Sequence, residues 1–392
     1  MKKTIFISII FIFFIICGGS KKTVNQSDSL IIVDVKANYP QKELILQDFM
    51  DVEYIALETT DEFLCQGEVL DIGKEIILVR NSQQIADGDI FIFDRKGKGL
   101  RIINRKGQGP EEYTNYSQGG VTLDEENNEI FINQGITVKV YDLYGKFLRS
   151  FPDSVGKRFL SLQNYDNNHL ICRKTYLTIT EKSTESHPYV IISKKDGRVV
   201  KDFRISFKRG IADYFRMYNK VSAYLPTFFN SIIPFQDSWI ITEMSSDTIY
   251  RLLPDFSITA FMKRIPSIHA MDPEIFLYPV LLTSRYYFLD ALKKESAPRD
   301  FPINKLMYDR TDKKIFEYTV YNGDYANKKT IDEIHPVSTN NYNIEIAFHQ
   351  KIEAYELFEA NEKGGLKGEL KKVASSLDED SNPVIMLAKH KK

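Results

Sequence analysis

Residues 90–110 read IFIFDRKGKGLRIINRKGQGP, and residues 138–151 repeat the pattern as VKVYDLYGKFLRSF. Each copy is a short apolar strand that ends in an aromatic residue and an aspartate, followed by a turn with glycine and a second strand. A hairpin that recurs along a chain indicates a repeat architecture, and the repeat decides the fold before other features do. The sequence therefore predicts an all-β chain of repeated antiparallel sheets.

The strands around these hairpins occur in sets of four, which is the number in one blade of a β-propeller. Complete sets span residues 68–103, 120–151, 159–203 and 232–263, and a ragged fifth set spans 286–320. The equivalent third-strand residues of the five sets are predicted to be Phe93, Tyr141, Ile192, Tyr250 and Phe316. Residues 209–229 and 266–285 are then expected to be long loops.

Turn residues support the repeat. Asp94 and Asp142 occupy equivalent positions, which favours local bonds to backbone amides over a unique catalytic role. The loop Gly73-Lys74 is predicted to use the glycine for a positive φ. The acidic run 124–126 lacks the ligand spacing of a calcium loop, so a solvated turn is expected.

A ring of blades must close, because exposed strand edges promote aggregation. Residues 52–58 and 384–388 both read as strands, and we predict that they pair in a composite sixth blade. Residues 30–50 carry a mixed pattern, in which Leu44, Ile45, Phe49 and Met50 lie near helical spacing. Residues 345–358 and 366–377 carry helix-forming residues, the latter with an apolar helix face. The predicted fold is thus an all-β, six-bladed β-propeller of four-stranded blades over residues 30–392, with a C-terminal helical insertion and closure by strands from both ends.

The N-terminus differs from the rest of the chain. Residues 1–16 have a basic start and an apolar run too short to span a bilayer, as in a secretory signal peptide. The following segment resembles a bacterial lipobox with Cys17 as the acylated residue, although Ile16 stands where that pattern prefers a small residue. Residues 17–29 read as a flexible tether. A secreted protein without lipid and a short membrane anchor are the alternatives.

Three segments carry a family resemblance: residues 51–61, the run GQGPEEY at 107–113, and residues 382–389. Together they resemble the six-bladed β-propeller lipoproteins of Gram-negative bacteria, which are distant relatives of NHL-repeat propellers. The resemblance covers the chain from about residue 30 to its end. It implies the six-bladed fold and an envelope location, and it carries over no functional residues. We expect an outer-membrane lipoprotein that faces the periplasm rather than the cell surface, anchored by its lipid and monomeric.

Composition limits the partners. The net charge is −1, so no electrostatic footprint for nucleic acid is present. Beyond Cys17 the chain has only Cys65 and Cys172, for which two buried thiols are favoured over a disulfide that stays possible. Trp239 lies in an apolar strand and is expected in the core rather than on a sugar-binding surface.

The segment after the first hairpin is the candidate ligand site. Its glycines do not form a dinucleotide fingerprint, because Pro110 and another strand follow where a helix is required. It carries a dense polar cluster on a loop between blades, and such loops ring one mouth of a propeller. The hypothesis that this cluster lines a ligand site competes with a purely structural loop; the candidate residues are Arg105, Gln108, Glu111, Glu112 and Tyr113.

No catalytic or metal motif stands out. The six histidines are not spaced as zinc ligands, and the chain lacks a serine-hydrolase elbow. The leading interpretation is therefore a binding scaffold without cofactor or metal, for an unidentified protein, small molecule or glycan. The main alternative is an NHL-like or lactonase-like enzyme that holds a divalent metal in its channel by residues from separate blades. A carbohydrate-binding module, with a row of exposed aromatic residues, is a third.

Overall fold

The computed structural model describes residues 30–82, 87–114, 116, 120–152, 159–174, 182–211, 214–216, 222–224, 232–295, 302–331, 334 and 345–391. The predicted signal peptide, Cys17 and the tether lie outside these ranges. None of the helices in the described ranges is long and apolar enough to cross a lipid bilayer.

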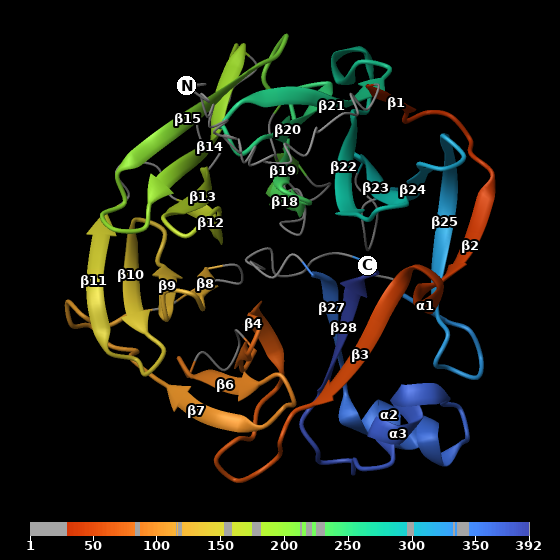
Figure 1. Cartoon of the computed structure of the whole chain (residues 1–392). Coiled ribbons are helices and arrows are strands. Elements are labelled where there is room, and N and C mark those ends of the chain that lie inside the picture. Colours follow the sequence, from red (N-terminus) through yellow and green to blue (C-terminus); the bar gives the residue numbers. More distant parts are fainter. Residues whose placement is uncertain are drawn as a thin grey trace, which may run out of the picture.

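Six sheets surround a central axis, as Figure 1 shows. Blades one to three each contain four antiparallel strands that follow one another from the centre to the rim. Blade one consists of β4 (Glu68–Ile72), β5 (Ile76–Arg80), β6 (Ile90–Asp94) and β7 (Gly99–Ile103). Blade two consists of β8 (Val121–Asp124), β9 (Glu129–Asn133), β10 (Thr137–Asp142) and β11 (Phe147–Pro152). Blade three consists of β12 (Phe159–Asn164), β13 (His169–Lys174), β14 (Glu185–Ser193) and β15 (Val199–Ser206).

Blades four and five follow the same order and gain extra strands at the rim. Blade four consists of β18 (Ile232–Phe235), β19 (Ser238–Thr242), β20 (Thr248–Leu252) and β21 (Ile258–Ile265). Blade five consists of β22 (Ile275–Leu282), β23 (Tyr286–Lys293), β24 (Ile303–Asp309) and β25 (Lys314–Asn322), with the short β26 (Lys329–Thr330) beside β25. A separate two-stranded sheet pairs β16 (Tyr214–Arg216) with β17 (Ser222–Tyr224).

The N-terminal segment runs around the rim of three blades, and we call its three strands the N-terminal belt. β1 (Ile31–Asp34) pairs in parallel with β21, and β2 (Gln41–Ile45) pairs in parallel with β25. After the one-turn helix α1 (Leu46–Phe49), β3 (Met50–Ala56) becomes the outer strand of blade six. Figure 1 shows the belt along the outside of these blades.

Blade six closes the ring with strands from both chain ends. Its described strands are β27 (Ile346–Ile352), β28 (Val384–His390) and β3, in that order. The helices α2 (Ala354–Glu362) and α3 (Gly368–Ala374) are inserted between β27 and β28 and lie outside the ring in Figure 1. The predicted six-bladed propeller, its helical insertion and its closure by the two terminal strands are confirmed.

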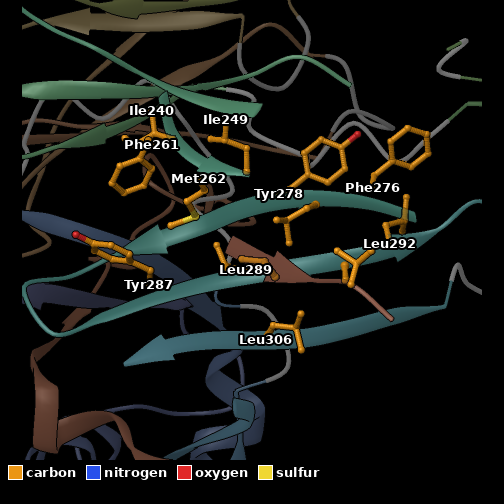
Figure 2. Packing of buried hydrophobic residues seen from close by; sticks show 14 of the residues in the cluster. Ile240, Ile249, Phe261, Met262, Phe276, Tyr278, Tyr287, Leu289, Leu292 and Leu306 are labelled. Atoms are coloured by element: carbon orange, nitrogen blue, oxygen red, sulfur yellow. The ribbon is translucent and has the colours of Figure 1, made fainter. Parts of the chain in front are cut away.

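The core lies between the blades. Each of the six hydrophobic clusters in the described residues joins one pair of neighbouring blades. Figure 2 shows the cluster between blades four and five, where Phe261 and Met262 of one sheet meet Tyr287 and Leu289 of the next. Because each sheet is covered on both faces, its inner strands are largely buried, and all five residues of β5, four of them apolar, are buried.

The repeated turns behave as predicted. The Asp94 carboxylate accepts hydrogen bonds from the backbone amides of Lys96 and Lys98, and Asp142 accepts the same pair from Tyr144 and Lys146. The glycines of these turns and their third copy all adopt a positive φ, namely Gly97, Gly145 and Gly197. The aspartates are therefore structural caps of the hairpins.

Three predictions about elements were wrong. Residues 266–285 are not a loop, because they contain β22, the buried inner strand of blade five. Because β22 is the first strand of blade five, Phe316 lies in the fourth strand of that blade and not in the third. Residues 345–358 begin with β27 before the chain becomes helical. The mixed pattern of residues 30–50 corresponds to β1 and β2 followed by the one-turn helix α1.

A prediction about one turn was wrong, and another was correct only in part. Gly73 does not adopt a positive φ. A Cβ there would instead lie 2.5 Å from the Glu125 carboxylate, which accepts hydrogen bonds from the amides of Lys74, Glu75 and Ile76. The acidic run 124–126 is a solvated turn only in part: Glu126 is exposed and Glu125 is half-buried in the turn, whereas Asp124 is 1% exposed and bonds the Lys194 ammonium at 2.6 Å.

Candidate ligand-binding site

The five predicted site residues lie on the segment that joins β7 of blade one to β8 of blade two. Tyr113 is fully buried, and its hydroxyl donates to the Gly88 carbonyl at 2.6 Å and accepts from the Arg105 amide at 3.1 Å. Burial raises the pKa of Tyr113 to about 12, so the phenol is neutral at physiological pH. Tyr113 thus ties this segment to the loop between β5 and β6.

Arg105 and Glu112 hold the same segment in shape. The Arg105 Nε donates to the Gly145 carbonyl of blade two at 2.7 Å, and the Glu112 carboxylate accepts from the Gly109 amide at 2.8 Å. A Cβ at Gly107 would lie 1.9 Å from this carboxylate, so any larger residue there would displace the Glu112 side chain. The GQGP run is therefore built around the side chain of Glu112.

Gln108 and Glu111 have exposed side chains. The backbone beneath them is held by blade two, since the Tyr141 hydroxyl donates to the Glu111 carbonyl at 2.7 Å and the Lys139 ammonium donates to the Glu112 carbonyl. The structure thus brings the five residues together on one ordered segment. Their role in binding a ligand stays a prediction.

A pocket of about 420 Å³ lies next to this segment, and we call it the blade 1–2 pocket. Tyr113 lines it, whereas Arg105, Gln108, Glu111 and Glu112 do not. Its other lining residues come from the β5–β6 loop, the β7–β8 segment, the β9–β10 loop and the start of β12, and are Arg80, Asn81, Ser82, Asp87, Gly88, Lys106, Thr114, Tyr116, Asn133, Gln134, Gly135 and Phe159.

A second pocket of about 890 Å³, the blade 6–1 pocket, adjoins the first. It is lined by the segment before β4, by the residues around the end of β27, and by residues 379–383 in front of β28. Both pockets include Arg80, Asn81 and Ser82. The end of β5 therefore forms a shared wall between two polar hollows on one face of the propeller, which we call the pocket face.

Arg80 is the unusual residue of this wall. It is 6% exposed, and its guanidinium makes no hydrogen bond or ion pair with any residue that the structure describes. The ring of Tyr116 lies 5.7 Å from the guanidinium carbon. Burial lowers the pKa of Arg80, which reflects the cost of keeping this charge away from water.

The carboxylate nearest in register to Arg80 is already engaged. Glu68 lies opposite Arg80 in the β4–β5 pair, but the Lys351 ammonium holds its carboxylate at 2.9 Å. Lys351 also bonds Glu353 at 2.9 Å, and Glu379 and Asp380 add further negative charge to the blade 6–1 pocket. The two pockets share a cation and differ in their surroundings.

The cysteines and Trp239 take structural places. Cys65 and Cys172 are buried and form no disulfide with each other, and they lie in different hydrophobic clusters. Burial raises the pKa of Cys65 to about 11, so its thiol is protonated and a poor nucleophile at neutral pH. Trp239 is half-buried and stacks on Tyr165 with ring centroids 6.1 Å apart, next to the cluster between blades three and four.

The Asp71 carboxylate, on the inner strand of blade one, links blade one to blade two. Asp71 is 1% exposed and accepts from the amides of Leu123 at 2.7 Å and Ile72 at 2.8 Å. Burial raises its pKa well above the usual range. Among the residues that the structure describes, no group of three His, Cys, Asp or Glu is arranged to hold a metal ion.

Sequence reasoning missed the wall at residues 80–82. The available signal was the run IILVR at 76–80, where a charged residue ends a strand that is otherwise apolar. A sequence does not reveal whether such an arginine finds a partner, because partners come from distant loops.

Comparison with known proteins agrees with this architecture. A family model described as a 6-bladed beta-propeller matches residues 20–344. A crystal structure of a Bacteroides fragilis protein inferred to be exported superposes with a TM-score of 0.58 at 15% identity, covering 93% of this chain and all of that one. At this identity the match shows a shared fold and nothing further.

Two other solved structures are more distant. A member of the duf4221 family from Bacteroides vulgatus has a TM-score of 0.48 at 12% identity, over 88% of this chain and 99% of its own. Virginiamycin B lyase from Staphylococcus aureus has a TM-score of 0.36 at 7% identity, over 87% and 99%. No curated protein sequence matches the chain.

Proposed function

We propose that this chain, which belongs to the DUF5128 family of six-bladed β-propellers, is a cell-envelope lipoprotein that binds a small polar ligand on its pocket face. The observation that carries the proposal is the shared wall of Arg80, Asn81 and Ser82 between two adjoining pockets. Fold alone does not give function, so the proposal rests on this site.

The chemistry of the pockets supports binding of a polar molecule. Ligand pockets are commonly about 300–1,000 Å³ in volume, and both hollows fall in this range. Neutral polar side chains, among them Asn81, Ser82 and Gln134, line the blade 1–2 pocket together with aromatic rings. The loops of several blades converge there, as ligand-binding loops do on a rigid scaffold.

The envelope location is supported by the N-terminal sequence. The apolar run before Cys17 has the features of a signal peptide, and the segment around Cys17 resembles a lipobox. The Bacteroides fragilis protein of the same fold is itself inferred to be exported. We propose acylation at Cys17, attachment to the outer membrane and exposure of the propeller to the periplasm.

Binding is tested by blocking the shared wall. The full chain is purified in detergent, and saturation-transfer difference NMR is recorded with a panel of neutral sugars, sugar acids, amino acids and dipeptides. Ser82→Trp places a large indole ring where the two pockets meet and should abolish the signals of the bound compounds. Ser206→Trp, at an exposed position on the outer strand of blade three, is the matched control. If Ser82→Trp and the wild type give the same signals, the proposed site is wrong.

Anchoring is tested separately in a Gram-negative host. Cys17→Ala should move the protein from the membrane fraction to the soluble fraction and remove incorporation of labelled palmitate. Cys65→Ala changes a buried thiol and should leave both results unchanged. Membrane retention and labelling of Cys17→Ala would exclude this acylation site.

A further inference from the structure

Arg80 is a buried cation that makes no ion pair with the residues in the described ranges, although the Glu68 carboxylate acts on its charge at longer range. A guanidinium stays charged in proteins, and removing a charge from water without a partner is costly. Arg264 shows the satisfied case: it is 3% exposed, and it bonds the Asp247 carboxylate at 3.2 Å and the Met244 carbonyl at 2.9 Å. Arg80 is nearly as buried and has no such bonds in the described part of the chain.

The side chain of Arg80 lines both pockets. A guanidinium offers its N–H groups as a fork that matches two oxygens of a carboxylate or phosphate. Glu68, the carboxylate opposite in register, is bonded to Lys351 at 2.9 Å. An anion that pairs directly with the Arg80 guanidinium would therefore lie inside the pocket, where a ligand can reach it.

The surrounding charges favour a single negative charge on that ligand. The blade 1–2 pocket contains Lys106 and Asp87 besides Arg80. The adjoining pocket carries Glu353, Glu379 and Asp380, which repel a multiply charged group. A carboxylate with one charge fits this balance better than a phosphate with nearly two.

The rest of the blade 1–2 pocket is built for hydroxyl groups. Ser82, Thr114 and Gln134 line it with hydroxyl and amide groups, which both donate and accept hydrogen bonds, and Gln134 donates to the Thr114 hydroxyl at 3.0 Å. Asn81 is already bonded through both polar atoms of its amide, accepting from the Gln66 amide at 3.0 Å and donating to Asp87 at 2.6 Å. A pocket of about 420 Å³ has room for one sugar ring or two. We propose that the guanidinium of Arg80 binds the carboxylate of a sugar acid of the hexuronic class in the blade 1–2 pocket. This inference rests on the proposed function and specifies its ligand.

The test uses the full chain in detergent and isothermal titration calorimetry with galacturonate, galactose, galactose 6-phosphate and N-acetylalanine. Galacturonate should bind at least tenfold more tightly than galactose. Arg80→Gln should weaken galacturonate at least tenfold and leave galactose unchanged, and Arg80→Lys, which keeps the charge but loses the fork, should also weaken it. Arg285→Gln is the matched control, because Arg285 also lies near a tyrosine ring, at 4.9 Å, but its side chain is 52% exposed.

The melting temperature of each variant without ligand controls for folding. Arg80→Gln should melt at or above the wild-type temperature, because no ion pair is lost and a buried charge is removed. A large fall in the melting temperature would indicate an internal partner and overturn the inference.

The other outcomes separate the inference from the function on which it rests. If galactose and galacturonate bind equally, and their binding is lost in Ser82→Trp but kept in Arg80→Gln, the proposed role of the ligand carboxylate is wrong. The proposed binding site is then still supported. If galactose 6-phosphate binds more tightly than galacturonate, the anion is a phosphate and the inference is wrong. If N-acetylalanine binds as tightly as galacturonate, the pocket does not require a sugar and the inference is wrong. If no compound, including those of the wider panel, shows binding that Ser82→Trp removes, both the inferred ligand and the proposed binding function are wrong.

Discussion

Gly97 contacts the strand that closes the ring. Its φ is +86°, and an added Cβ would lie 1.9 Å from the carbonyl oxygen of Ala56 in β3, while its own carbonyl accepts from the Glu58 amide at 2.7 Å. Gly97→Ala should therefore lower the free energy of unfolding by about 2–4 kcal/mol, since both the backbone strain and the clash must be relieved.

Gly364 provides the matched control for this prediction. Its φ is +66°, and nothing lies within 4 Å of an added Cβ. Gly364→Ala should cost only the strain of a positive φ, about 1 kcal/mol. Urea unfolding midpoints of the two variants decide the matter, and equal losses would show that the contact with Ala56 contributes nothing.

Asp290 should make stability depend on pH. It is 1% exposed, and burial raises its pKa to about 7, against 3.8 for an ordinary aspartate. Below pH 4 both the folded and the unfolded carboxyl are protonated. Between pH 4 and 7 only the unfolded carboxyl ionises, so stability falls as the pH rises, and the loss is complete above pH 7.

Asp290→Asn removes this titration. It should raise the free energy of unfolding at pH 8 by up to about 4 kcal/mol and have little effect at pH 4. Asp237→Asn, whose side chain is 70% exposed, should change stability by under about 0.5 kcal/mol at either pH. Thermal unfolding at the two pH values measures both. A stabilisation that is the same at pH 4 and pH 8 would contradict this account.

Residue roles could be predicted where they depend on local bonds. Asp94 and Asp142 bond amides two and four residues ahead, and such caps repeat with the hairpin that contains them. Arg80 and Gly73 could not be predicted, because the groups that matter to them come from other segments. For Gly73 this group is Glu125, which lies 52 residues further along the chain.

At the scale of elements, Glu125 of blade two binds the β4–β5 hairpin of blade one. Its carboxylate accepts from three consecutive amides in the β4–β5 turn, at 2.6, 2.9 and 3.0 Å. Glu125→Gln keeps the shape but loses the charge and one acceptor oxygen, and should cost about 1–3 kcal/mol of stability.

The neighbouring residue is the control. Glu126 makes an exposed ion pair with Lys74 at 3.2 Å. Glu126→Gln should cost less than about 1 kcal/mol, as exposed pairs do. Chemical denaturation of both variants measures the difference, and a loss in Glu126→Gln as large as that in Glu125→Gln would remove the special role of the turn.

Elements were predictable where their pattern was self-contained. The hairpins of blades one to four and the strand at residues 384–388 carry alternating or continuous apolar residues with turn chemistry at their ends. β22 was hidden because its segment contains Pro266, Pro273 and Pro279, which normally mark loops. β1, β2 and β27 were hidden because they depend on pairing with remote strands, which overrides local helix propensity.

At the scale of the molecule, the belt should divide stability into two contributions. A chain that starts at residue 46 lacks β1 and β2, so the outer edges of blades four and five become exposed; it should unfold at a lower urea concentration but cooperatively. A chain that starts at residue 58 also lacks β3, the outer strand of blade six, and should lose cooperative unfolding.

Both truncations are compared with a chain that starts at residue 30. Circular dichroism and tryptophan fluorescence follow unfolding, and size-exclusion chromatography detects aggregation through uncovered edges. Identical midpoints for the chains that start at residues 46 and 58 would show that ring closure does not depend on β3.

The order of the belt has a mechanical consequence. If Cys17 carries the proposed anchor, tension from the membrane enters the domain at Leu30, directly before β1. β1 runs parallel to β21 over four paired positions, and a pull along its axis loads them in shear rather than peeling them one by one. β2 stands next in line, bonded to β25 over five positions. Force must therefore break two outer attachments before any load reaches β3, and the closed ring is protected from its own tether.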